Sequence, residues 1–139
     1  MKRILIALLV AATALFADDV KIYKGTGYDV IARVDDGKIY KGTGYDVVCR
    51  VDGDKVYKGT GYDVLVRIDG EKVYKGTGYD VVLTIRDGKI YKGTGYDVIA
   101  RIDDGKVYSG TGYDVSFRFD GFLTKEEFVA AWFAANYIW

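Results

Sequence analysis

Tyrosine and arginine are the residues of this chain whose types and spacing could form a binding surface. Both recur at intervals of 17 residues along the middle of the sequence. Aromatic rings stack on apolar and sugar faces, and guanidinium groups stack on the rings. We therefore predict a surface for a protein, peptide or glycan partner, formed by Arg33, Tyr40, Arg50, Tyr57, Arg67, Tyr74 and Tyr91. The alternative is that these residues only pack across neighbouring strands.

Catalytic and metal-binding chemistry is poorly supported. The chain has no histidine, and its serines are Ser109 and Ser116, so a hydrolase triad is excluded. Its aspartates recur once per repeat, which suits a structural role better than a tuned acid and base pair. The segment DGFLTKEEF resembles half of an EF-hand loop, but Arg118 stands where a ligand carboxylate is needed. We predict no enzyme activity, no cofactor and no metal site.

The composition describes one folded domain. The chain has 139 residues, with 20 basic and 20 acidic side chains, so no net field favours a nucleic-acid partner. Residues 1–17 have the basic start, apolar run and small residues of a signal peptide, with cleavage between Ala14 and Ala17. We therefore predict a periplasmic or secreted protein. The lone Cys49 can form no internal disulfide, and its repeat position predicts a buried small residue.

A 17-residue repeat organises residues 18–121. The phrase GTGYDV occurs six times, beginning at Gly25, Gly42, Gly59, Gly76, Gly93 and Gly110. A second turn follows each copy and reads Asp-Gly or Gly-Asp/Glu in most repeats. These pairs are typical of type I′ and type II′ hairpin turns. The sequence therefore predicts two short antiparallel strands per repeat.

Strand register follows from the turns. Around Asp36-Gly37, the hairpin predicts Arg33 opposite Tyr40 and two further pairs, one ionic and one apolar. Around GTG, a three-residue loop predicts Ile39 opposite Val47. Apolar and polar residues alternate from Tyr28 to Asp35, which predicts a half-buried strand. Its apolar face is expected to carry Tyr28, Val30, Ala32 and Val34.

These patterns predict an all-β fold in which six hairpin repeats form a coiled or barrel-like antiparallel meander. The alternative is a parallel β-solenoid with one repeat per coil. Residues 122–139 predict one C-terminal helix, because Thr124 and Glu127 form a capping box before an aromatic stripe. We expect this capping helix to lie on the sheet, to plug an open end, or to join chains into a homo-oligomer.

The junction DGKIYKG resembles that of MORN repeats (membrane occupation and recognition nexus), with Asp36, Gly37, Tyr40 and Gly42 at the matching positions. The resemblance implies an extended antiparallel meander that serves as a binding or scaffolding surface.

Together these features predict an exported, non-enzymatic repeat protein whose β-sheet offers a binding or assembly surface. The alternative function is that of a small outer-membrane β-barrel, since tyrosines at the strand ends are similar to aromatic girdles.

Overall fold

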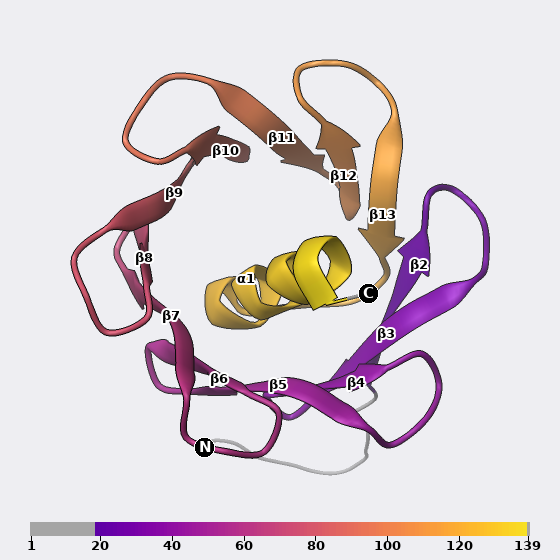
Figure 1. The fold of residues 1–139 in the computed structure, drawn as a ribbon. Helices are drawn as coiled ribbons and strands as arrows, with labels where there is room; N and C mark the ends of the chain where they lie inside the picture. Colours follow the sequence, from indigo (N-terminus) through magenta and orange to yellow (C-terminus); the bar gives the residue numbers. More distant parts are fainter. Residues whose placement is uncertain (1–18, 139) are drawn as a thin grey trace, which may run out of the picture.

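In the part of the chain that the structure describes, twelve antiparallel strands close into a barrel around one helix (Figure 1). The computed structural model describes residues 19–138, so the predicted signal peptide lies outside the described residues. The predicted barrel-like antiparallel meander of six hairpin repeats is confirmed, and the structure shows that it is closed. The solenoid alternative is wrong because every strand pair is antiparallel. The strands are β2 (Val20–Lys24), β3 (Val30–Asp35), β4 (Lys38–Lys41), β5 (Val47–Asp52), β6 (Lys55–Lys58), β7 (Val64–Asp69), β8 (Lys72–Lys75), β9 (Val81–Arg86), β10 (Lys89–Lys92), β11 (Val98–Asp103), β12 (Lys106–Ser109) and β13 (Val115–Phe119).

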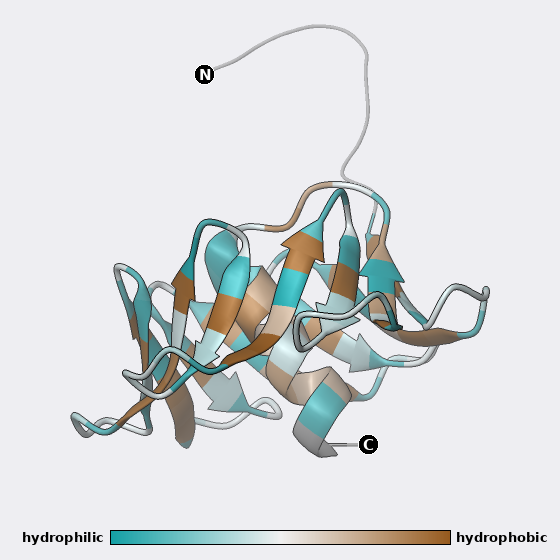
Figure 2. Ribbon diagram, turned by 90° about the horizontal axis from the view of Figure 1, so that it is seen from above, coloured by the Kyte–Doolittle hydropathy of each residue, from teal (hydrophilic) through white to brown (hydrophobic). Residues whose placement is uncertain are grey.

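Each GTG loop projects outward and joins two strands into what we call a lobe (Figure 1). Lobe 1 is β2 and β3, lobe 2 is β4 and β5, and the numbering continues to lobe 6, which is β12 and β13. The second turns join one lobe to the next, and pairing of β13 with β2 closes the ring without a connecting loop. Viewed from the side, the lobes splay outward around the helix (Figure 2).

The turns between lobes have the predicted geometry. Asp36 and Gly37 both have positive φ, at 50° and 80°, as a type I′ turn requires. At the next turn, Gly53 has a φ of 63° and Asp54 is not among the positive-φ residues, which is the pattern of type II′. The predicted register across the first turn is confirmed, with Arg33 opposite Tyr40.

The register across the GTG loops differs from the prediction. Ile39 lies opposite Cys49, not Val47, and Tyr40 takes Val47 as its partner. The cause is a β-bulge that inserts Val48 into the ladder, and an equivalent bulge occurs in each of the other five lobes. The carbonyl of the inserted residue accepts a hydrogen bond from the first glycine of the next loop, as Val48 does from Gly59 at 2.9 Å. The bulge therefore ties each lobe to its neighbour.

The C-terminal segment forms helix α1 (Lys125–Phe133), which continues as a π-helical turn, η1 (Ala134–Ile138). The predicted capping box is present: Thr124 Oγ1 accepts from the Glu127 amide, and Glu127 accepts from the Thr124 amide. The second carboxylate oxygen of Glu127 accepts from the Gly37 N–H at 3.1 Å, which anchors the helix start to the turn between β3 and β4. Lys125 also donates to the Gly70 carbonyl.

The core lies inside the barrel, between the strands and the helix. Phe128 and Trp132 are each 6% exposed and pack against Phe117 of β13. The predicted burial of the aromatic stripe is therefore confirmed for Phe128 and Trp132, which are buried by residues of their own chain. The association of chains through the helix stays a prediction. No helix in the described part of the chain is long and apolar enough to cross a membrane.

Candidate functional site

An arginine from each of five lobes reaches over the next lobe and stacks on two of its tyrosines. Arg33 of lobe 1 lies with its guanidinium carbon 4.1 Å from the ring centre of Tyr40 and 4.8 Å from that of Tyr45, both in lobe 2. Its Nη2 donates to the carbonyl of Gly44, the last residue of the GTG loop, at 2.9 Å. We call this arrangement of arginine, two tyrosines and loop carbonyl a clasp.

The clasp recurs with nearly constant geometry. The guanidinium carbon lies 4.1–4.3 Å from the first tyrosine and 4.8–5.2 Å from the second. In each clasp the two rings meet edge to face, with centroids 6.0–6.3 Å apart. The five arginines are Arg33, Arg50, Arg67, Arg101 and Arg118. Each of these arginines donates one hydrogen bond to a loop carbonyl and is attracted to two ring faces of the next lobe, so the clasp holds adjacent lobes together.

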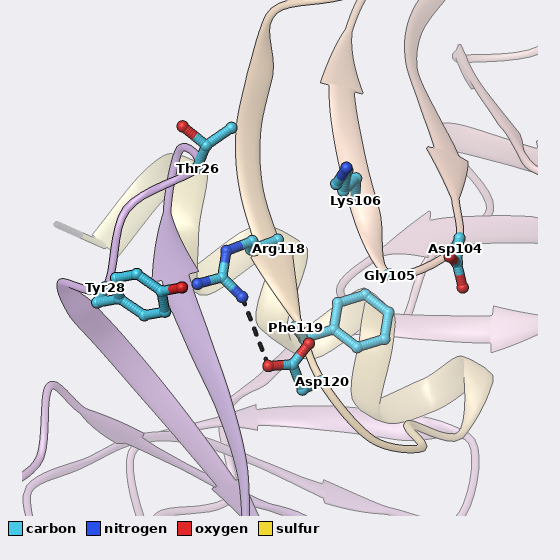
Figure 3. A pocket seen from close by; sticks show the side chains of 8 residues that line it. All are labelled: Thr26, Tyr28, Asp104, Gly105, Lys106, Arg118, Phe119 and Asp120. Atoms are coloured by element: carbon cyan, nitrogen blue, oxygen red, sulfur yellow. Dashed lines mark hydrogen bonds and ion pairs between the residues drawn. The ribbon is translucent and has the colours of Figure 1, made fainter.

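Arg118 makes the clasp that closes the barrel. It stacks on Tyr23 and Tyr28 of lobe 1 at 4.3 Å and 4.9 Å and donates to the Gly27 carbonyl. Beside it, a groove of about 400 Å³ opens on the surface (Figure 3). Asp120 contributes to this groove and pairs with Arg118 at 3.5 Å. The groove lies between lobe 6 and lobe 1, where β13 pairs with β2.

The clasp on lobe 5 departs from the pattern. Thr84 of lobe 4 stands where the other repeats have the clasp arginine, and its hydroxyl donates to the Gly93 carbonyl of lobe 5 at 2.7 Å. Arg86, two residues later, replaces the aspartate of the other repeats and lies 5.1 Å from the Tyr91 ring centre. Within residues 19–138, no guanidinium contacts Tyr96 and no donor reaches the Gly95 carbonyl.

The lobe tips carry the most exposed aromatic side chains. The tip tyrosine follows each GTG loop and is 84–85% exposed, and its neighbouring aspartate is exposed as well. The six tip tyrosines are Tyr28, Tyr45, Tyr62, Tyr79, Tyr96 and Tyr113. One ring face meets the arginine in five lobes, and the rest of each ring faces solvent. The barrel therefore presents six chemically similar tips around its rim.

The structure brings the sequence-predicted site residues together in pairs. Arg33 stacks on Tyr40, Arg50 on Tyr57, and Arg67 on Tyr74, while Tyr91 receives Arg86 at a longer distance.

These pairs are half-buried on the outer wall of the barrel. The prediction that they form one binding surface stays a prediction, because their contacts are also those of cross-strand packing.

Sequence reasoning missed the tip tyrosines as candidate site residues. The alternation rule placed Tyr28 with Val30, Ala32 and Val34 on the apolar face, but Tyr28 is 84% exposed. The bulge shifts the face alternation between the tip and the strand. The signal was the adjacent apolar pair Val30-Ile31, which breaks strict alternation and marks an inserted residue.

One other residue with reactive chemistry, Cys49, lies away from this surface. Cys49 is fully buried, as predicted, and burial raises the pKa of its thiol from 9.0 to about 12. Its Sγ lies 3.8 Å from the Ala130 carbonyl oxygen of the helix. Among residues 19–138, no group of three or more cysteine, aspartate and glutamate side chains is placed to hold a metal ion.

A family model described as "6-fold beta flower protein" matches residues 43–134. The match supports the predicted class of β-hairpin repeats; it identifies the beta flower family and not MORN repeats. No curated protein and no solved structure is significantly similar to the chain.

Proposed function

The chain belongs to the 6-fold beta flower family, and from this premise we propose that it is an exported, non-enzymatic protein that uses its six lobe tips to bind a polymeric glycan. The observation that carries the proposal is the ring of tip tyrosines, each 84–85% exposed. Six large aromatic rings exposed to solvent lower the solubility of the protein and contribute nothing to its core. Tyrosine is also enriched at recognition surfaces, where its ring packs and its hydroxyl forms hydrogen bonds.

The chemistry of each tip supports a sugar ligand. Beside Tyr45 stand the exposed Thr43 and Asp46, which supply a hydroxyl and a carboxylate next to an aromatic face. A sugar ring offers C–H groups to such a face and hydroxyls to such acceptors. Because the clasp holds the tip tyrosine against Arg33, less side-chain entropy is lost on binding.

The repetition of the site supports a repetitive ligand. Six weak and similar sites on one rigid ring bind a polymer with an avidity that exceeds the affinity of each site. A peptide with a single sequence motif would use only one or two of the tips. A polysaccharide presents the same chemical unit to every tip.

Binding to a panel of polysaccharides, including peptidoglycan, chitin and cellulose, tests the proposal by co-sedimentation. We expect Tyr45→Ser to weaken binding a few-fold, and replacement of all six tip tyrosines by serine to abolish it. Phe122→Ser is the matched control, because Phe122 is 81% exposed but lies outside the lobe tips. The proposal fails if no polysaccharide binds, or if the six-fold variant binds as the wild type does.

Export is tested separately by expressing the complete chain in a bacterium and fractionating the cells. We expect a shortened product in the soluble periplasm or the medium, cut between Ala14 and Ala17. Recovery of the uncut chain in the cytosol would contradict export without affecting the binding proposal.

A further inference from the structure

Lobe 5 has the two tyrosines of a clasp but not the arginine. In the other five lobes, a guanidinium from the preceding lobe stacks on both rings and donates to the last glycine carbonyl of the loop. In lobe 5 the equivalent ring pair is Tyr91 and Tyr96, and the equivalent carbonyl is that of Gly95. We propose that this open clasp binds an arginine side chain of a partner polypeptide.

The five closed clasps show which chemistry the lobe takes. The same ring pair and carbonyl accept a guanidinium five times in this molecule, at 4.1–4.3 Å from the first ring and 2.8–3.0 Å from the carbonyl oxygen. A planar cation that donates in its own plane fits this geometry, and an ammonium group does not reproduce it. Lobe 5 keeps the residues of the receiving side, Tyr91, Gly95 and Tyr96, and the exposed Asp97 beside Tyr96.

Thr84 does not fill the open clasp. Its hydroxyl donates to the Gly93 carbonyl at 2.7 Å, and the residue is 6% exposed, so it closes the base of the site. The side chain is too short to cover the ring faces. The rings of lobe 5 are also not in the edge-to-face contact that the other five pairs make, among the described residues.

Arg86 is the cation that could compete for the site. Its guanidinium carbon is 5.1 Å from the Tyr91 ring centre, farther than the first ring lies in any closed clasp, and its side chain is 40% exposed. By comparison, the side chains of three clasp arginines, Arg33, Arg50 and Arg118, are only 11–18% exposed. Arg86 has Glu71 at 4.0 Å, which offsets its charge near an incoming guanidinium. The Arg86 guanidinium therefore lies over the Tyr91 ring and, among the described residues, leaves the Tyr96 ring and the Gly95 carbonyl free for a ligand.

The test is a titration of the full chain with the peptide acetyl-Gly-Arg-Gly-amide, followed by amide and aromatic NMR shifts. We expect shifts at Gly95, Tyr96 and Tyr91, and none at the equivalent positions of lobe 2. The citrulline peptide, which has the same shape without the charge, is expected to bind at least ten-fold more weakly.

Two matched substitutions test the site itself. Thr84→Arg installs the residue found in the five sister repeats and is expected to abolish the shifts in lobe 5. Arg33→Thr opens the clasp of lobe 2 and is expected to create a second binding site at Gly44 and Tyr45. Arg86→Asp restores the repeat aspartate and is expected to strengthen peptide binding three-fold or more.

Three results would overturn the proposal. Equal shifts at all six tips would mean that the peptide binds the exposed tyrosines without regard to the open clasp. Unchanged binding to Thr84→Arg would place the peptide elsewhere. Shifts in lobe 5 that follow chloride or acetate and not the peptide would make Arg86 the centre of an anion site. The tip-tyrosine proposal for glycans survives each of these results, since it depends on all six lobes.

Discussion

Replacing Arg50 by methionine should destabilise the barrel by about 2 kcal/mol. Its guanidinium lies 4.3 Å from Tyr57 and 4.9 Å from Tyr62, and each cation–π contact is worth about 0.7 kcal/mol at a partly exposed site. Its hydrogen bond to the Gly61 carbonyl, at 2.8 Å, contributes only about 1 kcal/mol, because this carbonyl is exposed and water can bind it after the substitution. Methionine keeps the apolar stem, so the loss reports the charged head group.

Equilibrium unfolding in urea, followed by far-UV circular dichroism, measures this loss. For a domain of this size, about 2 kcal/mol also lowers the melting temperature by about 8 °C. Arg50→Lys should lose about half as much, because it keeps the charge without the planar stack. Asp52→Asn is the control: Asp52 lies 3.9 Å from Arg50, but it is 73% exposed, and the ion pair should contribute less than about 0.5 kcal/mol. A loss below that value for Arg50→Met would refute the clasp as a stabilising unit.

Three further predictions concern the helix and the core. Trp132→Ala should lower the free energy of unfolding by about 3–5 kcal/mol, because Trp132 is 6% exposed between the helix and β13; a loss under about 1 kcal/mol in urea would contradict this. Glu127→Gln should lower it by about 1–2 kcal/mol, because the carboxylate accepts from both Thr124 and Gly37, while Glu126→Gln should cost less than half of this. The raised pKa of Cys49 means that the folded protein keeps a proton that the unfolded chain releases above pH 9, so stability falls as the pH rises. Between pH 7 and pH 10 the wild type should lose on the order of 1 kcal/mol relative to Cys49→Ala in urea titrations, and an unchanged difference would contradict the burial of the thiol.

Local features of this fold could be read from the sequence because they depend on few residues. Asp36-Gly37 specifies its turn through two positive φ values, and the turn fixes Arg33 opposite Tyr40. The capping box likewise needs only Thr124 and Glu127. Each of these was predicted and is confirmed.

Features that depend on one inserted residue per repeat were predicted incorrectly. The bulge at Val48 shifts the ladder and turns the tip tyrosine to solvent, so a rule of strict alternation assigns the wrong face. The clasp was only half predicted for the same reason. Arg33 and Tyr40 are neighbours across a turn, but Tyr45 reaches Arg33 only through the loop that the bulge redirects.

Two kinds of departure from the repeat remain, and only one has a packing explanation. The lumen position of each repeat is held by Ala32, Cys49, Val66, Leu83, Ala100 and Phe117. The helix lies against β3 to β6, where Cys49 meets the Ala130 carbonyl, and the bulky Phe117 packs on its aromatic stripe. An off-centre helix thus requires unequal residues inside a six-fold barrel.

The change at Thr84 and Arg86 has no such cause. Both residues lie in β9, whereas the helix lies mainly against β3 to β6. Among residues 19–138, the guanidinium nearest the Tyr91 ring is that of Arg86, at 5.1 Å from the ring centre. The change removes a contact that holds lobes together in the other five lobes, and it sets Arg86 directly opposite Lys89, a pairing of like charges that destabilises a sheet. Substitutions that weaken a fold in one repeat of an otherwise regular array are expected where that repeat has a separate task. That reasoning supports lobe 5 as the place where this molecule receives an arginine from outside.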